Sequence, residues 1–117
     1  MRFTWIFIIF FLTPGKECLG QTKRAAKFYR KGITEIFSQD KNLESAESHF
    51  LTAIRISPDY SDAYMALGDM YSRTGKIDQA LTNYRIGAES GSEREGYFKL
   101  GKTAIKAGYY SIASEAF

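Results

Sequence analysis

Apolar and small residues recur along the central part of the chain at helical spacing. One stripe follows the intervals i, i+3, i+4 and i+7, which place its members on a single helix face: Tyr64, Leu67, Gly68 and Tyr71. A second stripe follows a glycine suited to a left-handed helix end and contains Ile77, Ala80, Leu81, Tyr84 and Ala88. The pattern predicts two antiparallel helices joined by a tight turn at Gly75.

The same pattern occurs more than once. The motif of tyrosine, two residues, leucine and glycine stands at residues 64–68 and again at residues 97–101. Further matches at the same offset of 33 pair Gly75, Ala80 and Tyr84 with Gly108, Ala113 and Phe117. At an offset of 34, Ala46 and Phe50 match Ala80 and Tyr84. Three units of about 34 residues follow, and the third is incomplete.

The register of the first unit stays open between two alternatives. Phe28 and Gly32 match the bulky residue and the glycine of the later units only if two extra residues lie in the turn at residues 38–42. Without that insertion, Ile33, Thr34 and Phe37 take the core positions. Pro58 ends the last helix of this unit, and Asp59 or Ser61 is placed to cap the next helix.

These residues resemble the tetratricopeptide repeat (TPR) family, whose pattern is a bulky residue, Leu-Gly, Tyr, then Gly, Ala, an aromatic residue, Ala and Pro. The second unit matches from Tyr64 to Tyr84, whereas Gly87 and Ser92 stand where alanine and proline are usual. The resemblance implies an all-α solenoid of helix hairpins over residues 21–117, with units at about 25–58, 61–92 and 94–117. A Sel1-like repeat, suggested by residues 88–91, is a lesser alternative.

By this resemblance, the concave side of the solenoid, lined by the first helix of every hairpin, holds a protein or peptide partner. The implied positions are Asp62, Met65, Asp69, Ser72 and Arg73 in the second unit and Glu95, Phe98, Lys102, Ile105 and Lys106 in the third. Met65, Phe98 and Ile105 are apolar residues on a nominally exposed face, which favours a bound ligand over ordinary solvated surface. We expect the basic members to gather at one end of this face and the acidic members nearer the other.

The first twenty residues have the three-part layout of a signal peptide. Arg2 precedes an apolar run from Phe3 to Leu12, and a Cys18-Leu19-Gly20 triplet follows. The run holds about ten residues, whereas a membrane-spanning helix needs roughly twenty. We therefore expect cleavage after Gly20, no stable transmembrane helix afterwards and a mature chain that starts at Gln21, with an uncleaved anchor as the alternative.

The net charge and the candidate reactive residues argue against several classes of function. The net charge of +3 is too small to indicate nucleic acid as a partner. Without residues 1–20 the charge is +2, from 14 basic and 12 acidic residues, which predicts no strong attraction to anionic lipid. His49 is the single histidine and has no cysteine or second histidine beside it, so no metal site is expected. Glu44 and Glu47 are more typical of a solvated helix face than of a catalytic pair. The sequence thus predicts no enzyme and no cofactor.

The leading functional hypothesis is an exported scaffold of the bacterial cell envelope, periplasmic or outer-membrane associated, that binds a protein partner in the TPR groove. The alternative is a structural spacer or oligomerisation arm for a downstream domain. The opening of the chain resembles Bacteroidetes-type envelope proteins in which TPR units precede an OmpA-like peptidoglycan-binding domain. Because the third unit stops at Phe117, we expect a longer protein and self-association through Tyr110, Ala113 and Phe117.

Overall fold

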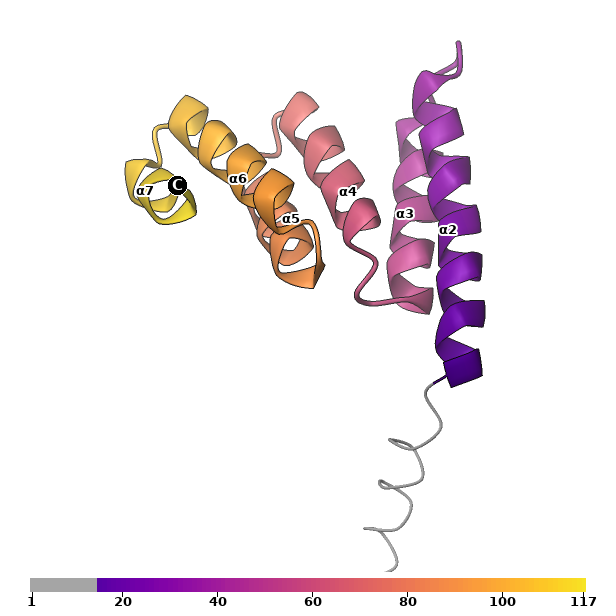
Figure 1. The fold of residues 1–117 in the computed structure, drawn as a ribbon. Helices are drawn as coiled ribbons and strands as arrows, with labels where there is room; N and C mark the ends of the chain where they lie inside the picture. The colour runs from indigo at the N-terminus through magenta and orange to yellow at the C-terminus, as the bar shows by residue number, and fades with distance from the viewer. Residues whose placement is uncertain (1–14) are drawn as a thin grey trace, which may run out of the picture.

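The computed structural model describes residues 15–117, and this part of the chain is all helical. In chain order the helices are α2 (Gly15–Phe37), α3 (Leu43–Ile56), α4 (Ser61–Arg73), α5 (Ile77–Ser90), α6 (Glu93–Ala107) and α7 (Tyr110–Ala116). They form the hairpins α2–α3, α4–α5 and α6–α7, which follow one another in a solenoid (Figure 1). The expected all-α fold is confirmed.

The expected signal peptide lies mainly outside the described residues, so it stays a prediction. Helix α2 runs without a break from Gly15 across the expected cleavage point after Gly20. Over residues 15–117, no helix combines the length and the apolar character that crossing a membrane requires.

A glycine packed against an aromatic ring closes each hairpin. A methyl group placed at Gly68 would lie 2.5 Å from the ring of Tyr84, and one placed at Gly32 would lie 2.7 Å from the ring of Phe50. The same relationship joins Gly101 to Phe117, at 2.6 Å. The absence of a Cβ lets the ring of the second helix lie directly on the backbone of the first.

This recurring contact decides the register of the first unit. Gly32 in the first unit is equivalent to Gly68 in the second, so the turn between α2 and α3 contains the two extra residues. In the other register Phe37 would be a core residue, but its side chain is 78% exposed. Thr34 is exposed as well and donates its hydroxyl to the Arg30 carbonyl oxygen at 2.9 Å.

The helix ends use different means to satisfy their backbone groups. Asn42 caps α3, where its side chain accepts a hydrogen bond from the Ser45 amide at 3.1 Å. Gly75 and Gly108 take φ values of 83° and 82° just after α4 and α6, a conformation that favours glycine. The expected cap of α4 is wrong, because Tyr60 is its N-cap residue and the Asp59 carboxylate accepts from the Ser57 hydroxyl instead.

The core runs through all three hairpins. Large buried side chains fill its centre, namely Phe50, Leu67, Tyr71, Tyr84 and Leu100. A smaller cluster of Ala25, Ala53 and Ala63 lies where α2, α3 and α4 meet, with Phe28 and Tyr60 packed against it. Alanine at these three positions allows the helix backbones to approach closely.

Candidate protein-binding groove

An open groove of about 420 Å³ lies between α2 and α4 and reaches the first turns of α6. These helices are the first members of the three successive hairpins, which Figure 1 shows in chain order. The lining side chains are Tyr29, Ile33, Ile36, Phe37, Lys41, Leu43, Asp62, Met65, Ala66, Asp69, Met70, Arg73, Thr74, Glu95 and Lys99. The groove therefore belongs to the first helices of the hairpins, as the TPR resemblance implies.

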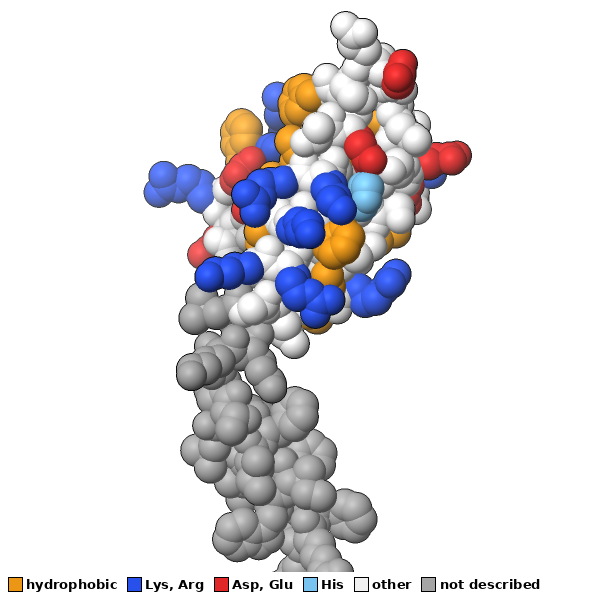
Figure 2. All heavy atoms as spheres, turned by 90° about the vertical axis from the view of Figure 1, so that its right-hand side faces the viewer, with side chains coloured by type: hydrophobic (Ala, Val, Ile, Leu, Met, Phe, Trp, Pro, Cys, Tyr) orange, Lys and Arg blue, Asp and Glu red, His pale blue; other side chains and the backbone are white. Residues whose placement is uncertain are grey.

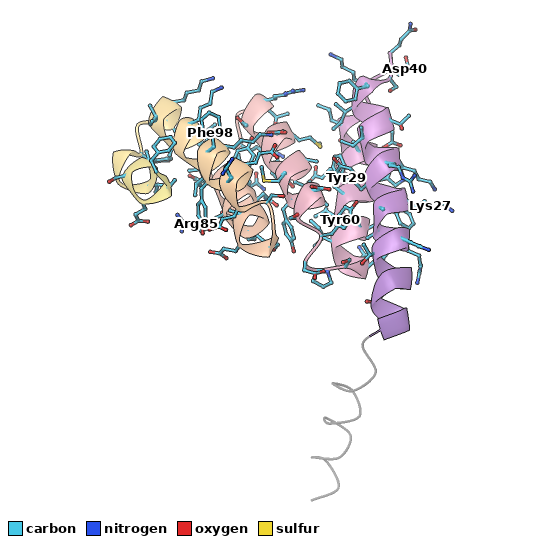
Figure 3. All side chains as sticks on the ribbon, viewed as in Figure 1. Lys27, Tyr29, Asp40, Tyr60, Arg85 and Phe98 are labelled. Atoms are coloured by element: carbon cyan, nitrogen blue, oxygen red, sulfur yellow. The ribbon has the colours of Figure 1, made fainter. Side chains whose placement is uncertain are left out.

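The apolar part of the lining comes largely from α2. Tyr29, Ile33 and Ile36 are partly buried against the core and also line the groove. The Tyr29 ring meets the Tyr60 ring edge-on at 5.7 Å, in the space between the first hairpin and α4 (Figure 3). Phe37 and Leu43 are 78% and 38% exposed and form an apolar rim near the α2–α3 turn. A ligand with an apolar side chain would remove this surface from water.

The groove carries an interhelical polar cluster at Asp69. Its carboxylate accepts the Tyr84 hydroxyl at 2.6 Å and binds Lys99 Nζ at 3.0 Å, and Lys99 also pairs with Glu95 at 3.1 Å. Partial burial lowers the pKa of Lys99, but the hydrogen bonds to Asp69 and Glu95 outweigh it, so the pKa stands above its usual value. The cluster links α4, α5 and α6, and both of its carboxylates, Asp69 and Glu95, already have partners within it.

The remaining charged residues of the groove have no ion-pair partner within residues 15–117. They are Asp62, in the first turn of α4, and Arg73, in its last turn, together with Lys41 in the α2–α3 turn. Asp62 and Arg73 are separated by 11 positions along one helix, about 16 Å. The groove thus has one acidic and one basic end, each free to pair with a ligand.

The structure brings five of the ten expected groove residues into this hollow: Asp62, Met65, Asp69, Arg73 and Glu95. Ser72, Lys102, Ile105 and Lys106 do not line it. Phe98 contributes instead to a shallow hollow beside α7 with Tyr97 and Phe117. Phe98 and Ile105 are exposed as expected, at 58% and 48%. Lys41 lies with Arg73 among the lining residues of the groove, and the expected gathering of Arg73 with Lys102 and Lys106 stays a prediction.

The expected exposure of Met65 is wrong, since its side chain is only 5% exposed. A methyl group placed at Gly87 would lie 2.9 Å from Met65 Sδ, so Met65 fills the space that the usual alanine would take. Ala113, expected at an exposed end, is also buried at 5%, whereas Phe117 is 70% exposed.

Several groove residues were missed by the sequence reading. Tyr29, Ile33, Ile36 and Lys99 line the hollow but belong to none of the expected positions. The signal for Lys99 was its i+4 spacing from Glu95 on one helix. Predicting the α2 residues required the register of the first unit, and only the contact of Gly32 with Phe50 settles that register.

Stacked helix hairpins with a groove along their first helices define a helical-repeat protein. Residues 49–82, from α3 into α5, match the family model of the tetratricopeptide repeat. This match supports placing the chain in that family. No curated protein matches the chain. All-helical repeats of this kind typically bind proteins and are typically non-catalytic.

Proposed function

We propose that this chain holds a partner protein by a peptide segment bound in the groove between α2 and α4. The observation that carries the proposal is an open groove with an apolar side on α2 and unpaired charges at its two ends. The segment carries an apolar anchor, which packs on Tyr29, Ile33 and Ile36. It also carries an acidic group near Lys41 and Arg73.

We expect the charged ends to set orientation and encounter rate and the apolar contact to hold the complex together. Phe98, Ile105, Lys102 and Lys106 stay candidate contacts for a ligand that continues past the groove along α6.

The setting of this interaction is part of the proposal. A positive start, a short apolar run and a small-residue triplet support export, and we propose that the protein serves as a scaffold of the bacterial cell envelope. The competing proposal is a spacer or oligomerisation arm for a downstream domain. It is supported by the exposed aromatic rings of Phe98 and Phe117, at 58% and 70%. Light scattering tests the oligomerisation arm, which should self-associate and should return to the monomer with Phe98→Asp, because Phe98 is 58% exposed and does not close a hairpin as Phe117 does on Gly101.

Site-specific photo-crosslinking in the native host tests the groove. A photoreactive residue at Phe37 should capture a protein that the same residue at Leu51 does not, because Leu51 is exposed at 44% but lies on α3 away from the groove. The captured protein is then titrated against Arg73→Glu, with Arg85→Glu on α5 as the control for charge. Arg73→Glu should weaken binding, whereas Arg85→Glu should not. Equal capture at both positions, or equal binding by both variants, would contradict the groove proposal.

A further inference from the structure

The outer face of α2 gathers five basic side chains. Lys23, Arg24, Lys27, Arg30 and Lys31 are all exposed, and residues 18–34 contain no aspartate or glutamate. Their spacing confines them to about a third of the helix circumference, opposite the side that buries Ala25 and Gly32. Figure 2 shows the resulting group of basic side chains on this side of the molecule, and Figure 3 shows Lys27 pointing away from the core.

A shallow hollow of about 560 Å³ lies within this face, lined by Lys27, Arg30, Lys31, Thr34, Glu35 and His49. Its single acid is already bonded, because Glu35 accepts from the Ser45 hydroxyl at 2.6 Å and pairs with His49 Nδ1 at 2.8 Å. The hydrogen bond from Ser45 has the largest effect, and together with the contact to His49 it holds the pKa of Glu35 below its usual value. The Phe28 ring supports the hollow, stacked on His49 at 6.1 Å and with Lys31 Nζ at 5.2 Å from its centre.

The basic face is a local property that the net charge hides. The whole chain carries only +3, since acidic residues elsewhere offset the basic residues of α2. At physiological salt, a charged surface acts over about 8 to 10 Å, so a ligand at α2 senses this face and not the average of the molecule. The expectation of weak attraction to anionic lipid, which rested on net charge, therefore does not apply to α2.

We propose that the basic face of α2 docks on a bilayer containing anionic phospholipids. Lysine and arginine side chains bind the phosphates of such a surface, and the attraction adds up over the residues that reach it. The face is broad and open rather than a closed pocket, which suits a layer of headgroups.

The apolar run Phe3–Leu12 favours lipid over an acidic protein or a nucleic acid. Helix α2 starts at Gly15, three positions after this run, so Lys23 to Lys31 lie about 12 to 24 Å further along the helix. While residues 1–20 are retained, this apolar segment acts together with the polybasic patch, and stable membrane anchoring takes two such signals. After cleavage the basic face acts alone. All five basic residues follow Gln21, so the face persists whether or not cleavage after Gly20 takes place.

Vesicle co-sedimentation of the full chain tests the proposal. Neutral vesicles of phosphatidylcholine are compared with anionic vesicles made of equal amounts of phosphatidylcholine and phosphatidylglycerol. Any contribution of the apolar run to binding then appears with both kinds of vesicle. The test variant is Lys27→Glu/Lys31→Glu, with Lys27→Gln/Lys31→Gln as a milder form. The control is Lys102→Glu/Lys106→Glu on α6, which has the same spacing, the same exposure class and the same change in net charge. Circular dichroism verifies that every variant is folded.

We expect the native chain to bind the anionic vesicles more tightly than the neutral ones, by about fivefold for each lysine or arginine that reaches the surface. The α2 reversal should lose more than about tenfold of this affinity, the glutamine form should lose less, and the α6 control should keep it. Raising the salt from about 0.1 M to about 1 M should remove the preference.

Three results would overturn the proposal: no preference for anionic vesicles, an equal loss in the α2 and α6 variants, or tighter binding to polyglutamate or duplex DNA than to the vesicles. The last result would assign the face to an acidic protein or to a nucleic acid.

Discussion

The hydroxyl group of Tyr84 on α5 donates a 2.6 Å hydrogen bond to Asp69 Oδ1 on α4, and the same carboxylate binds Lys99 of α6. Burial raises the pKa of Tyr84 far above its usual value, and the hydrogen bond to Asp69 raises it further. The Tyr84 ring also lies on the backbone of Gly68, one residue before Asp69. One side chain therefore closes the second hairpin and, through Asp69, joins it to the third.

Removing the hydroxyl group should weaken this junction. We expect Tyr84→Phe to lower the free energy of unfolding by about 1 to 2 kcal/mol, because a hydrogen bond to a charged acceptor is lost. Lys99→Met should cost less, about 0 to 1 kcal/mol, since the Lys99–Asp69 pair is partly exposed, at 29% and 40%, and water screens it. Urea denaturation measures both values. A Tyr84→Phe variant as stable as the native chain would rule out the structural role of this bond.

Adding a methyl group at Gly68 should force the two helices of the second hairpin apart. The new Cβ would meet the Tyr84 ring at 2.5 Å, and Tyr84 is only 3% exposed and has little room to move. We expect Gly68→Ala to destabilise the chain by about 1 to 3 kcal/mol. Gly20→Ala is the matched control, because nothing lies within 4 Å of its Cβ and alanine favours a helix. Thermal unfolding of the full chain should show a lower midpoint for Gly68→Ala alone.

Alkaline pH should destabilise the chain through Tyr71. Burial, followed by the 2.7 Å hydrogen bond to Glu47, raises the pKa of Tyr71 to about 12. The unfolded state releases this proton near pH 10 while the folded state retains it, so the stabilisation is complete below pH 10 and is lost as the pH rises toward 12. The melting temperature, measured at several pH values across this range, should fall less steeply for Tyr71→Phe than for the native chain. An equal fall of the melting temperature in both chains would contradict this role of Tyr71.

The start of the mature protein is a separate prediction. Sequencing the N-terminus of the exported protein should give Gln21-Thr22-Lys23. Recovery of an intact Met1 in the membrane fraction would instead identify residues 1–20 as a retained anchor. Either result leaves the groove and the basic face of α2 in the chain.

The sequence by itself determined the helices and their pairing into hairpins. Helical periodicity and the recurrence of glycine with an aromatic residue are local signals, which is why the stripes around Leu67 and Leu81 predicted two helices of one hairpin correctly. The cap of α4 was predicted wrongly because Asp59 and Ser61 have other partners, Ser57 and Ser92. The hydrogen bond from Ser92 joins residues 31 positions apart, and no local pattern signals it.

Only the tertiary structure decided which side chains meet between packed helices. The contact of Gly32 with Phe50 set the register of the first unit and so turned Ile33 and Ile36 toward the groove. Met65 became a core residue because Gly87, on a neighbouring helix, leaves space for it. Periodicity shows which residues share a helix face, but whether that face meets solvent, a groove or another helix depends on how the hairpins pack.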